Sequence, residues 1–178
     1  MNAHMTCRIG ISVALLATSA LVTVPLGPVP FTLQTMVLAL LPIVLGTKVA
    51  VRSVALYLVL GAAGLPVFSG LAGGIAHLVG PTGGFLWGFL IGTALGGLVS
   101  RASASTRLGE ALGALTMLLT SYAAGTAQLA LVLGVSAPAA ATLAVLPFIG
   151  PDVLKLAVGV SVGRAVRRAL GQVPEGGL

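Results

Sequence analysis

The chain has 178 residues, of which 57% are hydrophobic and 7% charged, and its formal net charge is +6. Ordinary soluble domains carry about 25% charged residues, so this composition, with a mean hydropathy of +1.14, excludes that class and indicates a membrane protein. The length allows roughly six spanning helices of about 20 residues, and we expect no attached soluble catalytic domain. One cysteine and two histidines predict neither a disulfide framework nor a metal site.

Proline, glycine and charged residues divide the apolar sequence into six segments that are typical of membrane helices. The first follows Arg8 and resembles a signal peptide, but no clear cleavage site ends it, so we interpret it as a retained helix. The chain is therefore predicted to be a single all-α integral membrane domain, 1–178, with six transmembrane helices. Their predicted bounds are 8–25, 33–47, 50–65, 83–100, 109–134 and 139–165.

The basic residues near the helix ends predict the orientation in the membrane. The connections at 26–32, 66–82 and 135–138 contain no charged residue, whereas basic side chains flank the opposite helix ends. The positive-inside rule then places both termini in the cytoplasm of a multi-pass protein of the cell membrane. The same bases form no patch with aromatic residues, which predicts lipid and not nucleic acid as the surrounding partner. The flanking bases are Arg8, Lys48, Arg52, Arg101, Arg107, Arg164, Arg167 and Arg168.

The fourth segment carries a glycine at every fourth position, at Gly84, Gly88, Gly92 and Gly96. Such a stripe leaves one helix face without side chains, and another helix backbone can then approach it closely. We therefore predict a close helix pair at this face.

The connection at 66–82 is the longest of the external loops, and it is rich in glycine yet too apolar for a solvated linker. Long loops in compact domains often serve as lids, and irregular backbone at membrane depth has to be buried by protein. We expect this loop to fold back over the external mouth of the bundle as a cap.

Asp152 and Lys155 are the most informative residues, because they lie inside the last apolar segment. A charge near the centre of a spanning helix costs about 2.5–3.5 kcal/mol, and the spacing places both side chains on one helix face. Pro151 suits the first turn of a helix, which suggests that a helix starts or restarts there with free N–H groups beside the pair. We predict a ligand site; the alternative is a structural salt bridge to a neighbouring helix.

Other side chains at similar external depth could complete a pocket. Uncharged polar groups occur at Thr32, Gln34, Thr35, Tyr57 and Gln128. A lone Gln or Tyr in a membrane helix is more often an interhelical hydrogen-bond partner, but several polar groups near one mouth favour a pocket. Aromatic side chains lie in or beside the loops: Phe31 and Phe68 are candidates for packing on a ligand ring, whereas Phe85 and Trp87 could instead form an interfacial belt. The long loop adds the candidates Ser69, Gly73, Gly74, Gly80, Pro81 and Thr82.

Motifs of enzymes are absent from the sequence: it contains no Gly-x-Ser-x-Gly, no paired carboxylates, no His-Glu-x-x-His and no Walker A sequence. We therefore expect a transport protein that needs no cofactor, and any step driven by ATP would come from another subunit.

Four stretches in order resemble the BioY family, the biotin-specific substrate-binding (S) components of energy-coupling-factor (ECF) transporters. The resemblance implies an ECF S-component-like bundle of six helices that captures biotin from outside, under the loops between helices one and two and between three and four. It also implies a transmembrane coupling subunit and two ATPases as partners. The stretches are Gly27-Pro-Val-Pro-Phe-Thr-Leu-Gln-Thr35, Tyr57-Leu-Val-Leu-Gly-Ala-Ala-Gly-Leu-Pro-Val-Phe68, Gly80-Pro-Thr-Gly-Gly-Phe-Leu-Trp-Gly-Phe89 and Pro147-Phe-Ile-Gly-Pro-Asp-Val-Leu-Lys155.

The predicted biotin site that follows from the residues and the resemblance comprises Asp152, Lys155, Phe31, Thr32, Gln34, Tyr57, Phe68, Ser69, Gly73, Gly74, Gly80, Pro81, Thr82 and Gln128. Small residues of the first helix, Ala14, Ala17 and Thr18, are the predicted docking stripe for the coupling subunit, although they form no clean Ala-x-x-x-Ala pattern.

The chain also departs from the family pattern at two places: it reads Gly150-Pro151 where the family usually has Pro-Gly, and Ala127 where the family commonly has Trp. The alternatives are an S component for another small vitamin, or a self-sufficient carrier or channel. Which group of the ligand Asp152 and Lys155 each contact stays open.

Overall fold

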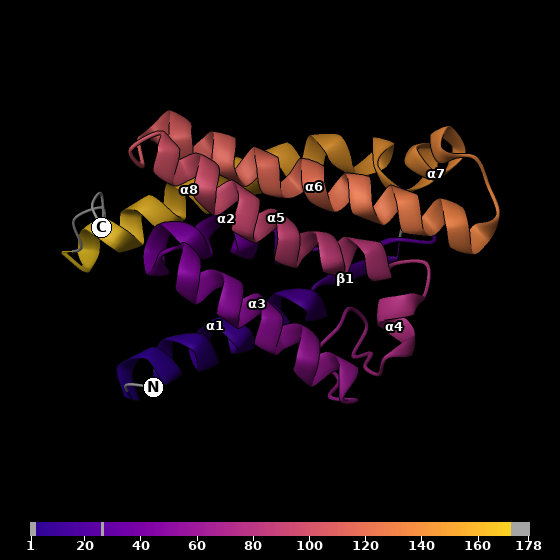
Figure 1. Ribbon diagram of the computed structural model, residues 1–178, viewed down its shortest axis with the longest axis horizontal. Helices are drawn as coiled ribbons and strands as arrows, with labels where there is room; N and C mark the ends of the chain where they lie inside the picture. Colours follow the sequence, from indigo (N-terminus) through magenta and orange to yellow (C-terminus); the bar gives the residue numbers. More distant parts are fainter. Residues whose placement is uncertain (1–2, 26, 172–178) are drawn as a thin grey trace.

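The computed structural model describes residues 3–25 and 27–171, and these are mainly α-helical (Figure 1). The helices among them are α1 (Ala3–Leu21), α2 (Gln34–Leu45), α3 (Thr47–Ala62), α4 (Ala76–Val79), α5 (Gly83–Ala102), α6 (Arg107–Leu133), α7 (Ala137–Ala144) and α8 (Ile149–Ala169). A 3-10 turn, η1 (Leu146–Phe148), joins the last two helices, and two short strands, β1 (Thr23–Pro25) and β2 (Pro30–Thr32), follow α1.

Four helical stretches within the described residues are long and apolar enough to cross a membrane, judged by length and composition: Ala3–Leu21, Gly83–Ala102, Arg107–Leu133 and Ala137–Ala169. Large apolar side chains such as Val59, Leu98 and Leu131 are exposed, as a lipid-facing surface requires. The helical membrane class is thereby supported, whereas the count of six spans and the cytoplasmic position of the termini stay predictions. Figure 1 shows that α1 begins and α8 ends at the same end of the bundle.

The predicted first helix, 8–25, is wrong at both of its ends. The structured helix begins at Ala3 and stops at Leu21, because the next residues form an antiparallel hairpin in which Thr23 pairs with Thr32 and Val24 with Phe31. Two β-branched residues and Pro25, which fixes its own φ and lacks an N–H group, favour extended backbone here over another helical turn.

The predicted last helix, 139–165, is interrupted. α7 ends at Ala144, η1 follows, and α8 restarts at Ile149 and continues to Ala169. Pro147 has no N–H group to continue the helix, which accounts for the break. Pro151 consequently lies in the first turn of α8, and the restart near this proline is as predicted.

The second and third helices differ from their predicted bounds of 33–47 and 50–65. α2 ends at Leu45 and α3 begins at Thr47, so that Gly46 alone joins them with a φ of +80°, a conformation that favours glycine. α3 also ends three residues earlier than predicted, at Ala62.

The glycine stripe of α5 packs against α6, as predicted. A side chain at Gly88 would meet the backbone of Ser121, and at Gly92 it would lie 2.6 Å from the carbonyl oxygen of Met117. In the same way Gly159 of α8 faces the backbone of Met36 in α2. The first contact joins α5 to α6 and the second joins α8 to α2.

Candidate functional site

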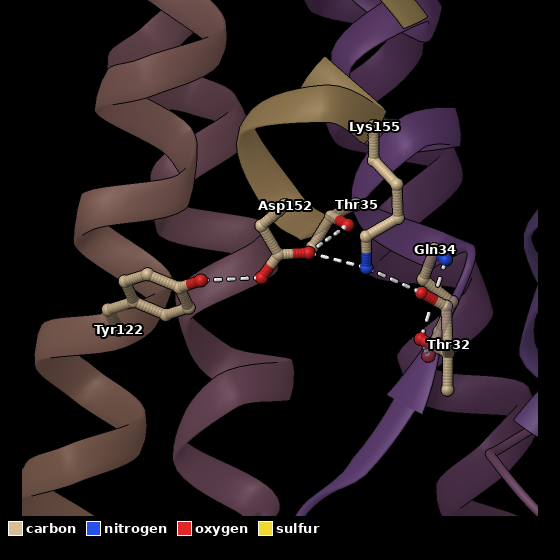
Figure 2. Close-up of polar contacts among 6 residues, drawn as sticks. All are labelled: Thr32, Gln34, Thr35, Tyr122, Asp152 and Lys155. Atoms are coloured by element: carbon tan, nitrogen blue, oxygen red, sulfur yellow. Dashed lines mark hydrogen bonds and ion pairs between the residues drawn. The ribbon is translucent and has the colours of Figure 1, made fainter. Parts of the chain in front are cut away.

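Asp152 lies in the first turn of α8, is 4% exposed, and receives hydrogen bonds on both carboxylate oxygens. Thr35 Oγ1 of α2 donates to Oδ1 over 3.0 Å, and Tyr122 Oη of α6 donates to Oδ2 over 2.5 Å. Lys155, one helical turn later, forms an ion pair with Oδ1 (Figure 2). The buried carboxylate is thus satisfied by donors from three helices, which is what allows a charge to be buried at this depth.

Lys155 connects this centre to the hairpin. Its ammonium group donates to the carbonyl oxygen of Thr32 in β2 over 2.7 Å and lies 4.0 Å from the ring centroid of Phe31. That distance is typical of a cation–π interaction. Phe31 in turn stacks on Phe148 with a centroid separation of 6.4 Å, so one lysine holds β2 and the aromatic pair beside α8.

A second hydrogen-bonded chain joins the hairpin to the long loop. Thr32 Oγ1 donates to Gln34 Oε1 over 3.2 Å, and Gln34 Nε2 donates to Tyr57 Oη over 2.8 Å. The Tyr57 hydroxyl then donates to the carbonyl oxygen of Val67 over 2.9 Å. β2, α2, α3 and the loop after α3 are therefore fixed relative to one another by side chains near the charge pair.

The charge pair borders a cavity of about 670 Å³, a volume that includes its open mouth. Small-molecule sites combine apolar walls with a few polar groups, and the lining of this cavity has that composition. The cavity is lined by Val29, Pro30, Phe31, Thr32, Gln34, Thr35, Phe68, Ser69, His77, Thr82, Phe85, Leu86, Phe89, Ser121, Ala144, Phe148, Asp152 and Lys155.

Four residues of the long loop, Phe68, Ser69, His77 and Thr82, line this cavity, and side chains of α5 and α6 fix the position of the loop. Gln128 Nε2 donates to the carbonyl oxygens of Leu78, over 3.0 Å, and Gly80, over 2.7 Å. Trp87 Nε1 donates to Leu78 as well, over 3.2 Å. Trp87, which could have belonged to an interfacial belt, thus also anchors the loop.

The structure brings eight of the predicted site residues together around the cavity: Phe31, Thr32, Gln34, Phe68, Ser69, Thr82, Asp152 and Lys155. The other six, Tyr57, Gly73, Gly74, Gly80, Pro81 and Gln128, do not line it. Tyr57 and Gln128 direct their polar groups to neighbouring residues and loop carbonyls. The glycines shape the loop: a side chain at Gly73 would meet the backbone of Leu65, and Gly74 has a φ of +98°.

Four residues at or beside the site are missing from the predicted set: Thr35, Phe85, Tyr122 and Phe148. The sequence marks Thr35 and Phe85 as polar and aromatic residues near the mouth, and Tyr122 is a polar group within the apolar part of α6. Its partner Asp152 lies 30 residues away in the sequence, and no local pattern announces that pairing. Phe148 belongs to the stretch Pro147–Lys155, and its ring is the one on which Phe31 stacks.

The predicted docking stripe lies on the outer part of α1. Ala14 and Thr18 are exposed, and Ala17 is half-buried. The stripe is accessible for a partner, and the partner itself stays a prediction.

Comparisons with known proteins agree on one family. A sequence model described as the BioY family matches residues 1–172. A protein from Pyrococcus horikoshii named as a probable biotin transporter BioY is 40% identical over 94% of this chain and 98% of its own length. The biotin transporter BioY of Rhodobacter capsulatus is 34% identical over 89% of this chain and 90% of its own length.

A solved crystal structure has the same fold. It is that of the S-component for biotin from an ECF-type ABC transporter, which superimposes with a TM-score of 0.85 at 26% sequence identity. The alignment covers 98% of this chain and 96% of the other.

Proposed function

The chain belongs to the BioY family, and on that premise we propose that it binds biotin as the substrate-capturing subunit of an uptake transporter. It is accordingly a transport protein and not an enzyme. The observation that carries the proposal is the buried pair of Asp152 and Lys155 at the wall of an otherwise largely apolar cavity. Biotin has the matching composition, since a polar ureido ring and a carboxylate are joined by an apolar thiophane ring and tail.

The pair retains free hydrogen-bonding capacity for a ligand. An ionised carboxylate offers about four lone-pair sites, and Asp152 accepts from three side chains, Thr35, Tyr122 and Lys155. An ammonium group has three donors, and Lys155 directs two of them to Asp152 and to Thr32. By this count, Asp152 keeps one acceptor site and Lys155 keeps one donor beyond the contacts described.

A ureido group presents a carbonyl oxygen flanked by N–H groups, which is the complement of an adjacent donor and acceptor. We therefore assign the ureido ring to the charge pair, with an N–H group donating to Asp152 and the carbonyl accepting from Lys155. The stacked Phe31 and Phe148 and the ring of Phe68 supply apolar surface for the thiophane ring and the tail.

Calorimetric titration of the purified protein with biotin tests the function and the site separately. Wild type is expected to bind biotin, whereas Asp152→Asn and Lys155→Met are expected to bind much more weakly, because each leaves the other charge buried and unpaired. Lys48→Met is the matched control, since Lys48 is exposed and does not line the cavity. Absence of binding by wild type would refute the biotin assignment, and unchanged binding by both site variants would refute the site.

Biotin analogues test the assignment of the ureido group. Biotin methyl ester keeps the ureido ring and loses the carboxylate charge, so it is expected to bind almost as well as biotin. In 2-iminobiotin the ureido carbonyl is replaced by a protonated imine, which would face the ammonium group of Lys155 and is expected to bind much more weakly. The reverse order of affinities would show that Lys155 holds the carboxylate instead.

We also propose that a coupling subunit and two ATPases energise transport, and that Ala14, Ala17 and Thr18 contact the coupling subunit. The exposure of Ala14 and Thr18 supports this, as does the likeness to a protein described as an S-component of an ECF-type transporter. Co-purification of ATPase subunits with wild type, and its loss on Ala14→Trp, is the expected result. Retention of the ATPases by Ala14→Trp would exclude this stripe as the contact.

Six spanning helices with both termini in the cytoplasm complete the proposal. Cys7, which is exposed near the start of α1, reports on this orientation. In intact cells it is expected to be protected from a membrane-impermeant thiol reagent and to react after the cells are opened. Reaction of Cys7 in intact cells would indicate the opposite orientation and refute this part of the proposal.

A further inference from the structure

A second cavity, of about 260 Å³ including its opening, lies deeper in the bundle between α2, α5 and α6. It lies about one helical turn from the ligand cavity along the same three helices. On α5, Phe89 lines the ligand cavity and Thr93 lines the second cavity; on α6, Ser121 lines the ligand cavity and Met117 lines the second. Leu38 and Met117 line this second cavity, Phe89 lines the ligand cavity, and all three belong to the same buried cluster.

Thr93 is the first sign that this deeper cavity is polar. Its side chain is 1% exposed, and its hydroxyl has no hydrogen-bond partner among the residues that the structure describes. Other hydroxyls of the helices behave differently: Ser53 and Thr116, for example, donate to the carbonyl oxygen four residues earlier. A buried hydroxyl without a partner costs about 1–3 kcal/mol, so native structures rarely leave one unsatisfied.

Glu110 is the second sign. It lines the same cavity, is 2% exposed, and pairs through Oε2 with Arg164 at 2.5 Å and through Oε1 with Arg167 at 2.6 Å. The contact of Oε1 lacks hydrogen-bond geometry, and Arg164 Nε is also without a hydrogen-bond partner within residues 3–25 and 27–171. These two atoms and the Thr93 hydroxyl are the buried side-chain N and O atoms of the described residues that lack a partner.

The backbone contributes a further acceptor. Pro42 lies inside α2 and has no N–H group, so the carbonyl of Leu38, four residues earlier, loses its usual helical donor. Both residues line the cavity. The lining of one space thus includes a hydroxyl without a hydrogen-bond partner, a carboxylate oxygen held only by an ion pair, and a carbonyl without its usual helical donor.

We propose that this inner cavity is a binding site for ordered water, in which water connects Thr93 to Glu110. A cation is disfavoured by Arg164 and Arg167, and an anion by the Glu110 carboxylate, whereas water both donates and accepts and needs two to four polar partners. The consequence is that water lies inside the bundle at Thr93, about one helical turn from Phe89 of the ligand cavity. This inference does not depend on the identity of the ligand in the outer cavity.

Thiol reactivity tests the proposal in purified protein. Cys7 is the only cysteine, so Cys7→Ser provides a background for Thr93→Cys and for the control Val54→Cys, which is equally buried, at 0%, in the apolar core. The probe is 2-aminoethyl methanethiosulfonate, which reacts with thiolate, and apolar surroundings suppress thiolate formation. Thr93→Cys is therefore expected to react at least about tenfold faster than Val54→Cys, and an equal or slower rate overturns the proposal.

Thr93→Val decides the matter if the cysteine variant does not fold. In a dry cavity the threonine hydroxyl is an unsatisfied group, and its replacement by a methyl group raises the melting temperature. In a hydrated cavity the replacement removes a partner of the water, so the melting temperature is expected to be unchanged or lower. A clearly higher melting temperature for Thr93→Val overturns the proposal.

Discussion

Release of the long loop by Gln128→Leu is expected to shorten the lifetime of bound biotin. Gln128 does not line the ligand cavity, and its amide donates to the carbonyl oxygens of Leu78 and Gly80 in the loop. Each intramolecular hydrogen bond contributes about 0.5–1.5 kcal/mol net, so the loss of both weakens the closed loop by about 1–3 kcal/mol. If the ligand leaves through the opened loop, its dissociation rate rises about 5- to 150-fold.

The assay is dissociation of radiolabelled biotin into an excess of unlabelled biotin, with wild type and variant at one temperature. Thr116→Val is the matched control, because Thr116 lies on the same helix and its hydroxyl donates only to the carbonyl of Leu112. Trp87→Phe removes one bond to the loop and is expected to give a smaller acceleration. A dissociation rate of Gln128→Leu equal to that of Thr116→Val would refute the view that these bonds hold a lid.

Two other substitutions test the packing and the polar centre. Tyr122→Phe removes one of the donors to Asp152. Because a hydrogen bond to a charged group contributes about 1.5–3 kcal/mol, we expect a lower melting temperature and weaker biotin binding. If both quantities equal those of wild type, the hydrogen bond is dispensable. Gly92→Ala places a methyl group against the carbonyl oxygen of Met117 and is expected to destabilise the protein by about 1–3 kcal/mol. Gly10→Ala, where nothing lies within 4 Å, is its control, and equal thermal stability of the two variants would contradict the close packing of α5 on α6.

The features that the sequence predicted are those encoded by local pattern. The glycine repeat of α5 lies within one helix, and it predicts that another helix packs closely there without identifying that helix as α6. Asp152 and Lys155 could be found because charge is rare in an apolar segment and because their spacing alone places them on one face. Both the glycine stripe and the charge pair could be recognised because the residues that define each of them lie within one helix.

Features that depend on tertiary pairing were missed or misread. Gln128 was predicted to touch the ligand, but its partners lie 48 and 50 residues away in a loop whose path no local pattern specifies. The hairpin after α1 was read as the end of a helix, because two three-residue strands are too short to show a period of two. The buried ion pairs of Glu110 are not predicted from the sequence, because its partners Arg164 and Arg167 lie near the end of another helix, α8.

The arrangement of the charge pair is compatible both with a structural salt bridge and with the proposed ligand site, because the two roles do not exclude each other. Lys155 and Asp152 join α8 to the hairpin, to α2 and to α6, so the pair does fix helices. A purely structural pair could be replaced by apolar side chains at little cost, but apolar replacements would not leave a free donor and a free acceptor facing a cavity. The same contacts that make the burial of the charges tolerable also hold them at the cavity wall. If the pair binds the ligand as proposed, a double Asp152→Leu, Lys155→Met variant is expected to lose binding without losing its fold.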